Sequence, residues 1–245
     1  MIRQSLIIIF LWAAVVSPTF AMSRSDSLAV SDTSGITAAK VNAEDSAQVL
    51  IAVCTKMLRE SPHNVPVRLR RAALYQWMGA DEKALSDYNL ILEDQPSCED
   101  ALLFRADIYR RQRSFRLARA DYERLIQIRP NNLKACLGLA ITNDEGGRPR
   151  EAMDQMNVIV EAWPNEALPY LVRGEMFMRR GIYPQALMDF DESIRLDPTN
   201  PDSYLSRGIY YKHRRKSSLA REDFRRAVEL GADANYVYSL LRDLR

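Results

Sequence analysis

The sequence is poor in the residues that hold metals and disulfide frameworks, with three cysteines and two histidines among 245 residues. Three cysteines are too few for the several disulfides of a small secreted scaffold. The two histidines, His63 and His213, lie far apart in the chain, so their spacing does not indicate a shared metal site. We therefore expect no bound metal, and we expect Cys54, Cys98 and Cys136 to be free thiols.

The motifs of common enzyme classes are also missing. The chain has no GxxxxGK[ST] loop, no GxGxxG fingerprint and no HExxH, CxxC or GxSxG pattern. With 34 basic and 32 acidic residues the formal net charge is +2, without the basic excess typical of nucleic-acid-binding domains. The sequence therefore indicates a protein that is not an enzyme and that binds neither a cofactor nor nucleic acid.

The first 42 residues predict a targeting segment and a linker. Leu6–Val16 is an apolar run of 11 residues, too short to cross a bilayer but long enough for a signal-peptide core. Thr19-Phe20-Ala21 follows as a cleavage site, so we expect a signal peptide at 1–21 and a flexible polar linker at 22–42. The protein would then be periplasmic or secreted, in a Gram-negative envelope. The alternative is an uncleaved anchor, the one case in which we expect membrane association.

The rest of the chain repeats with a period of 34 residues. A fixed period between 20 and 50 residues is typical of solenoids, so we divide the chain into units at 65–98, 99–132, 133–166, 167–200 and 201–234. Each unit predicts two helices, and the recurring proline ends the second one. The recurring residues are Pro62, Pro96, Pro130, Pro164 and Pro198; Ala84, Ala118, Ala152, Ala186 and Ala220; and Ala72, Ala106, Ala140, Gly174 and Gly208.

This pattern resembles the tetratricopeptide repeat, in which a small residue, a tyrosine, an alanine, an aromatic residue and a proline follow at fixed intervals. Unit two shows it as Ala106, Tyr109, Ala118, Tyr122 and Pro130. The resemblance implies an all-α fold, a right-handed superhelix of antiparallel helix pairs that serves as a protein-interaction scaffold. The flanks agree with it: 43–64 resembles a half-repeat helix without its partner, and 235–245 a C-terminal capping helix.

An arginine precedes the small residue in four units, and an aspartate lies 16 residues later. Unit three has Leu139 and Gln155 instead, and this joint loss indicates that the two residues touch. We predict structural ion pairs that brace the two helices of a unit. Unit three also has Asn143 and Met156 at the aromatic positions, so we expect this degenerate unit to be the softest. The predicted pairs are Arg71–Asp87, Arg105–Asp121, Arg173–Asp189 and Arg207–Asp223.

The resemblance implies that the first helices line a concave groove where partners bind. The groove-facing positions carry a leucine in every unit, where adaptors that clamp a C-terminal carboxylate carry lysine, so we do not expect that activity. Two interpretations of the leucines stay open: an apolar floor for a peptide or helix segment, or half-buried packing. The candidate groove residues are Leu69, Trp77, Leu103, Asp107, Arg110, Leu137, Leu171, Glu175, Met178 and Leu205.

Basic residues gather at the turns within units. Cations are favoured at helix C-termini, which explains most of them; the alternative is a strip for acidic partners. We expect a non-enzymatic interaction scaffold or adaptor of the cell envelope that binds another protein or a peptide segment. The alternative is a structural component of an envelope complex that uses its basic edge or self-association. The basic residues are Arg110, Arg111, Arg113, Arg148, Arg150, Arg179, Arg180, Lys212, Arg214, Arg215 and Lys216.

Overall fold

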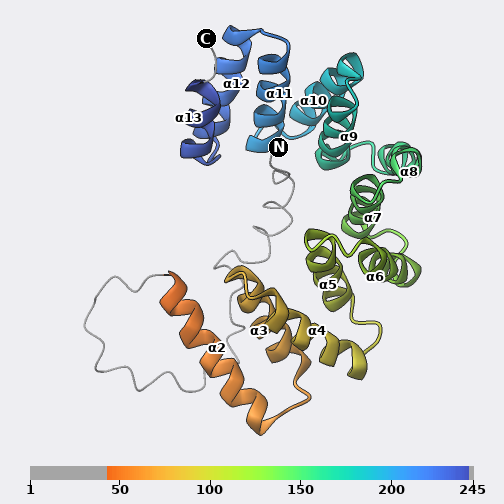
Figure 1. Ribbon diagram of the computed structural model, residues 1–245, viewed down its shortest axis with the longest axis vertical. Coiled ribbons are helices and arrows are strands. Elements are labelled where there is room, and N and C mark those ends of the chain that lie inside the picture. Colours follow the sequence, from red (N-terminus) through yellow and green to blue (C-terminus); the bar gives the residue numbers. More distant parts are fainter. Residues whose placement is uncertain (1–42, 243–245) are drawn as a thin grey trace. The chain divides into compact units, whose positions relative to one another are not determined.

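A computed structural model describes residues 43–242, and every regular element in that range is an α-helix (Figure 1). The all-α class expected from the sequence is therefore confirmed. The predicted signal peptide and linker, residues 1–42, lie outside the described residues, as do residues 243–245. Between residues 43 and 242, no helix combines the length and the apolar character needed to cross a membrane.

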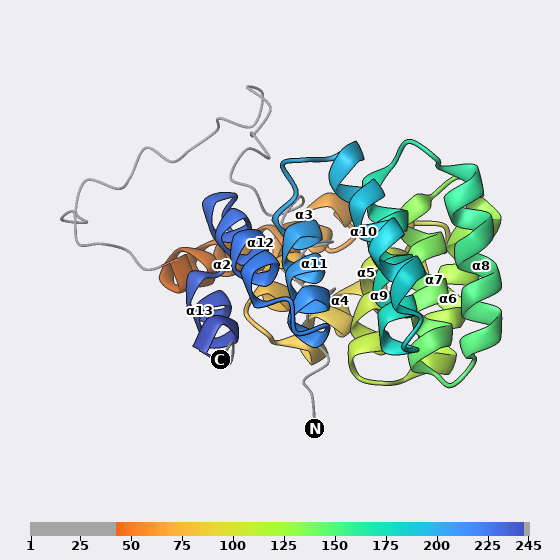
Figure 2. The ribbon, with the colours of Figure 1, turned by 90° about the horizontal axis from the view of Figure 1, so that it is seen from above.

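The chain divides into two compact units, residues 1–134 and 135–245. Helices joined by short turns pack side by side as hairpins within each unit, α3 with α4 and α5 with α6 in the first, α9 with α10 and α11 with α12 in the second (Figures 1 and 2). Each 34-residue window of the sequence thus contains two helices. The bounds are α2 Ala43–Glu60, α3 Val65–Trp77, α4 Asp81–Asp94, α5 Glu99–Arg111, α6 Phe115–Ile128, α7 Leu133–Glu145, α8 Pro149–Ala162, α9 Ala167–Arg179, α10 Tyr183–Leu196, α11 Pro201–His213, α12 Ser217–Glu229 and α13 Ala234–Arg242.

The turn inside each hairpin uses one left-handed residue. Gly79, Gly147 and Gly181 have φ values of 73°, 80° and 72°, a conformation that glycine adopts without a steric penalty. In the second and fifth hairpins the same place is taken by Arg113 and Arg215, with φ values of 60° and 58°. The turn geometry is therefore shared by all five repeats although two of them lack the glycine.

The recurring small residues allow the two helices of a hairpin to approach closely. A Cβ atom added to Gly174 would lie 2.8 Å from the Phe190 ring, and one added to Gly208 would lie 2.6 Å from the Phe224 ring. Both rings are fully buried, as are Tyr88 and Tyr122 in the first unit. Aromatic residues thus form the core of four of the hairpins, and Met156, also fully buried, takes this place in repeat three.

Helices α2 and α13 are the first and last helices of the described chain. Helix α2 buries Ala47, Cys54 and Leu58 and packs against α3, whereas α13 buries Val237 and packs against α12. Cys54, Cys98 and Cys136 are free, as expected. Burial raises the pKa of the Cys54 thiol, which makes it less reactive than an exposed cysteine.

Candidate functional site

The arginine–aspartate pairs form charge-assisted clamps between the two helices of a hairpin. In each pair the arginine Nε and Nη2 donate to the two carboxylate oxygens of the aspartate over 2.7–2.9 Å. The aspartates are buried and the arginines are about one-fifth exposed or less. Such bidentate pairs fix orientation as well as distance. The clamped pairs are Arg71–Asp87, Arg105–Asp121, Arg173–Asp189 and Arg207–Asp223.

Each clamping arginine also reaches the second helix of the preceding repeat, a contact that the sequence analysis missed. Its Nη1 donates to an oxygen on the residue 16 positions earlier in the chain, and its guanidinium lies over an aromatic ring at about 5.8 Å. One arginine therefore joins three helices. The acceptors are Thr55 for Arg71 at 3.1 Å, Asn89 for Arg105 at 2.7 Å, Asn157 for Arg173 at 3.3 Å and Asp191 for Arg207 at 2.7 Å.

Repeat three replaces the clamp by a neutral contact. The Asn143 amide donates to Gln155 at 3.0 Å and to Glu151 at 3.3 Å, linking α7 to α8. Asn143 is fully buried, and its Oδ1 atom accepts no hydrogen bond. Because an unsatisfied buried polar atom destabilises its surroundings, this repeat is held together less well than its neighbours.

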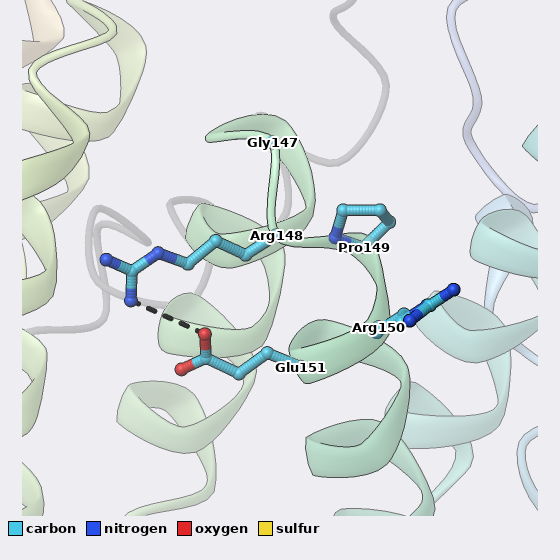
Figure 3. A pocket seen from close by; sticks show the side chains of 5 residues that line it. All are labelled: Gly147, Arg148, Pro149, Arg150 and Glu151. Carbon is cyan, nitrogen blue, oxygen red and sulfur yellow. Dashed lines mark hydrogen bonds and ion pairs between the residues drawn. The ribbon is translucent and has the colours of Figure 1, made fainter.

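A surface hollow of about 390 Å³ opens beside the turn of this repeat (Figure 3). Gly147, Arg148, Pro149, Arg150 and Glu151 line it, and all five belong to one turn and the start of α8. Arg148 donates to Glu151 at 3.4 Å, while Arg150 points away from both in Figure 3. Binding sites usually bring polar groups together from several elements, so this hollow does not form a ligand site.

The leucines at the groove positions are packing residues. Leu103, Leu137, Leu171 and Leu205 are buried, and Leu69 is half-buried. The Leu171 side chain belongs to a core cluster with Ala186, Phe190 and Tyr210. Of the two interpretations left open by the sequence, this burial favours packing over an apolar floor. The reason is physical: a residue one turn before the small residue is covered by the neighbouring helices.

Two polar residues assigned to the groove are buried as well. Asp107 and Arg110 are 8% and 4% exposed, and the buried Tyr122 hydroxyl donates to Asp107. Burial raises the pKa of the Asp107 carboxyl, while the hydrogen bond from Tyr122 and the positive charge of Arg110 oppose that rise. In the preceding repeat the Tyr88 hydroxyl donates to the buried Gln76 at 3.1 Å in a comparable way. These residues form interior networks rather than groove walls, which corrects the prediction for Asp107 and Arg110.

The remaining groove candidates lie on partly exposed faces. Trp77, at the end of α3 in the first unit, is 37% exposed. In the second unit Met178 and Glu175 lie on α9, both half-buried, and Met178 packs against the Leu171 cluster. Helix α9 contacts α11, the first helix of the next repeat. In the second unit, the face formed by α9 and α11 (the α9–α11 face) thus keeps two of the predicted groove residues, Glu175 and Met178, partly exposed.

Two carboxylates from neighbouring repeats share the α9–α11 face. The Ser206 hydroxyl of α11 donates to Glu175 of α9 at 2.8 Å. Burial raises the pKa of the Glu175 carboxyl, and burial together with the Glu175 charge raises the pKa of Asp202 to about 7. Neither carboxylate forms an ion pair with a described residue. The positive charge of Arg179 opposes the rise in the Glu175 pKa, but Arg179 forms its ion pair with Asp144, at 2.6 Å.

Much of the basic edge is occupied by contacts within the protein. Arg111 pairs with Asp81 at 2.9 Å, and both Arg179 and Arg180 pair with Asp144. The Arg214 guanidinium lies 5.0 Å from the centre of the Tyr183 ring. These contacts favour the structural interpretation of the basic turns. Nowhere in residues 43–242 do three or more His, Cys, Asp or Glu side chains gather in a way that suits a metal ion.

Comparisons with known proteins agree with the repeat. Family models described as "Tetratricopeptide repeat" match residues 82–133, 105–167 and 190–222. Human "Tetratricopeptide repeat protein 13" is 24% identical over 168 residues, 66% of this chain, and the matched part spans only 19% of that relative.

Solved structures show the same fold. A tetratricopeptide repeat protein from Parabacteroides merdae gives a TM-score of 0.74 at 24% identity, with 80% of this chain and 77% of that chain covered. A thermophilic protein of this type from Thermus thermophilus gives a TM-score of 0.61 at 15% identity, with coverages of 81% and 98%.

Proposed function

The chain belongs to the tetratricopeptide repeat family, and we propose that it is a non-enzymatic scaffold whose α9–α11 face binds a basic peptide or helix of a partner protein. Proteins of this fold bind other proteins, and such binding is the function that the chain's architecture supports. The observation that carries the finer proposal is the pair Glu175 and Asp202, two carboxylates from adjacent repeats that form no ion pair with a described cation.

A lysine or arginine of the partner would replace the missing cation. Desolvated charge pairs of this kind give specificity, because a partner with an acidic residue at the same place is repelled. Met178 lies on the same helix face as Glu175 and offers an apolar contact beside the acids. The face therefore suits an amphipathic segment with one apolar and one basic edge.

The test uses paired synthetic helices that differ only in carrying lysine or glutamate on the polar face. The lysine form should bind, and Glu175→Gln with Asp202→Asn should weaken it about tenfold or more, since a hydrogen bond to a charged group contributes roughly 1.5–3 kcal/mol. Asp154→Asn with Glu222→Gln removes the same charge from exposed sites on α8 and α12 and should leave binding unchanged. Equal binding of the two peptides, or equal loss in both variants, contradicts the proposal.

We also propose that the protein acts outside the cytoplasm, in the cell envelope. The support is the sequence of residues 1–21, a short apolar core followed by a small-residue cleavage site. Mass spectrometry of the natural protein should then find an N-terminus near Met22, in the periplasmic or secreted fraction. Recovery of chains that retain Met1 from the cytoplasm would contradict export.

A further inference from the structure

Helix α2 carries an apolar stripe that no described part of its unit covers. Val49, Leu50, Val53 and Met57 are 61%, 37%, 49% and 45% exposed. Their spacing places them on one side of the helix, because residues four apart lie one above the other. The adjacent side of the helix, with Ala47, Cys54 and Leu58, is buried, and α2 packs against α3. A contiguous exposed apolar stripe on one helix is a typical mark of an interaction surface.

The repeat register explains why the stripe is exposed. Leu50 and Met57 occupy the positions of Ala84 and Ile91, one period earlier, and those two residues are fully buried beneath α3 in a complete hairpin. Helix α2 is therefore a second helix whose first helix is missing among the described residues. The stripe is the side on which such a helix would pack.

Helix α2 begins earlier than the repeat register requires. The other second helices begin at residues 81, 115, 149, 183 and 217, so the register places their counterpart at residue 47. Helix α2 instead begins at Ala43 and continues through the three positions that form the turn in every other repeat. A helix of another molecule can therefore occupy this side.

The charges along α2 indicate which molecule. Asp45 lies at the start of the helix, whereas Lys56, Arg59 and Glu60, with a net charge of +1, lie at its end, and all four are exposed. A helix that is acidic at one end and basic at the other complements itself when two copies run antiparallel. With Val53 at the centre, Met57 of one copy lies opposite Val49 of the other, and Asp45 of one lies on the same flank as Lys56 of the other.

We propose that the α2 stripe is a self-association surface, on which α2 of a second copy of this chain packs antiparallel about a two-fold axis at Val53. Such an interface is closed, because each copy presents the same patch and no free patch remains for a third. This dimer uses none of the residues of the peptide-binding face on α9 and α11. The two proposals are therefore independent, and each copy in the dimer would keep its own binding face.

The mass of the purified chain, measured by analytical ultracentrifugation over a range of concentrations, tests the dimer. The natural chain should sediment as a dimer, and Val53→Glu should weaken association about a hundredfold or more because it places a charge at the centre of an apolar contact. Met188→Glu is the matched control, since Met188 is 71% exposed on α10 of the second unit. Circular dichroism shows whether each variant keeps its helicity. A natural chain that is monomeric throughout, or a folded Val53→Glu dimer, overturns the proposal.

An exchange of charges and a cysteine cross-link test the antiparallel orientation. Asp45→Lys and Lys56→Asp should each weaken the dimer, and the two changes together should restore it, because the flank charges are complementary again. Val53→Cys should form a cross-link between the two copies of residue 53, while Val158→Cys, at a site 64% exposed on α8, should not. Failure of the double variant to recover, or absence of the residue 53 cross-link, refutes this arrangement. A monomeric chain that binds only a helix of a different protein also refutes this arrangement.

Discussion

The clamp in repeat two gives a sharp test of how the repeats are stabilised. Replacing Arg105 by leucine removes two hydrogen bonds to Asp121 and one to Asn89, and it leaves the Asp121 carboxylate buried without a cation. Breaking a buried ion pair on one side costs about 3–5 kcal/mol. Because the Arg105 side chain is 19% exposed and that of Asp121 8%, we expect the lower end, about 3 kcal/mol, in the free energy of unfolding by urea.

The matched variant changes both partners, Arg105→Leu with Asp121→Gln, which are the residues that repeat three carries as Leu139 and Gln155. No charge is then left buried, so the double variant should lose only about 1 kcal/mol, mainly for the hydrogen bond to Asn89. The two changes should therefore interact by at least about 2 kcal/mol in a double-mutant cycle, and by more to the extent that Asp121→Gln alone destabilises the chain. A double variant as unstable as the single one would refute the reasoning that the carboxylate needs its arginine.

Three other perturbations have defined outcomes. Hydrogen exchange should be faster at residues 136–160 than in repeats two and four, because this repeat lacks the clamp and buries an unsatisfied amide; equal protection would contradict this. The pKa of Asp202 is raised to about 7, so its contribution to stability is lost as pH rises from about 4 to about 7. Asp202→Asn should thus raise the urea midpoint at about pH 8 and leave it almost unchanged at about pH 4. An equal effect at both pH values would show that the raised pKa of Asp202 is not the cause. Gly174→Ala should cost about 1–3 kcal/mol, because the new Cβ would lie 2.8 Å from Phe190. Gly79→Ala meets no atom within 4 Å and should cost about 1 kcal/mol through its positive φ alone; a reversed order in denaturation experiments would refute the steric explanation.

The fold could be predicted because the same pattern of residues recurs in every repeat. A single proline or alanine says little, but the same residue every 34 positions reports the same local packing five times. The ion pairs could be predicted for the same reason, since the joint absence of arginine and aspartate at Leu139 and Gln155 acts as an internal comparison. In a repeat protein, a comparison of the repeats with one another thus indicates which residues are in contact.

The site was predicted less well, because exposure depends on neighbouring helices that a position within one helix does not reveal. The sequence left open whether Leu103 and Leu171 form an accessible floor or pack inside, and they are buried, as is Asp107, which accepts a hydrogen bond from Tyr122. The contact of each clamping arginine with the preceding repeat did have a sequence signal. Thr55, Asn89, Asn157 and Asp191 all lie 16 residues before a clamping arginine and all carry an oxygen acceptor.

Each clamping arginine contacts three helices, and this restricts which whole repeats can be exchanged during gene duplication or design. Each arginine needs its aspartate in its own repeat and an oxygen acceptor at one position of the repeat before it. A 34-residue block with both features can be copied or moved without new compensating changes. Repeat three has only one of the two features. Its Asn157 accepts a hydrogen bond from the arginine of the next repeat, but Leu139 stands where an arginine would contact the preceding repeat. Repeat five lacks the acceptor as well, because Arg225 occupies that position. Recombination should therefore tolerate duplication of repeats one and four more readily than duplication of repeat five or insertion of a second copy of repeat three.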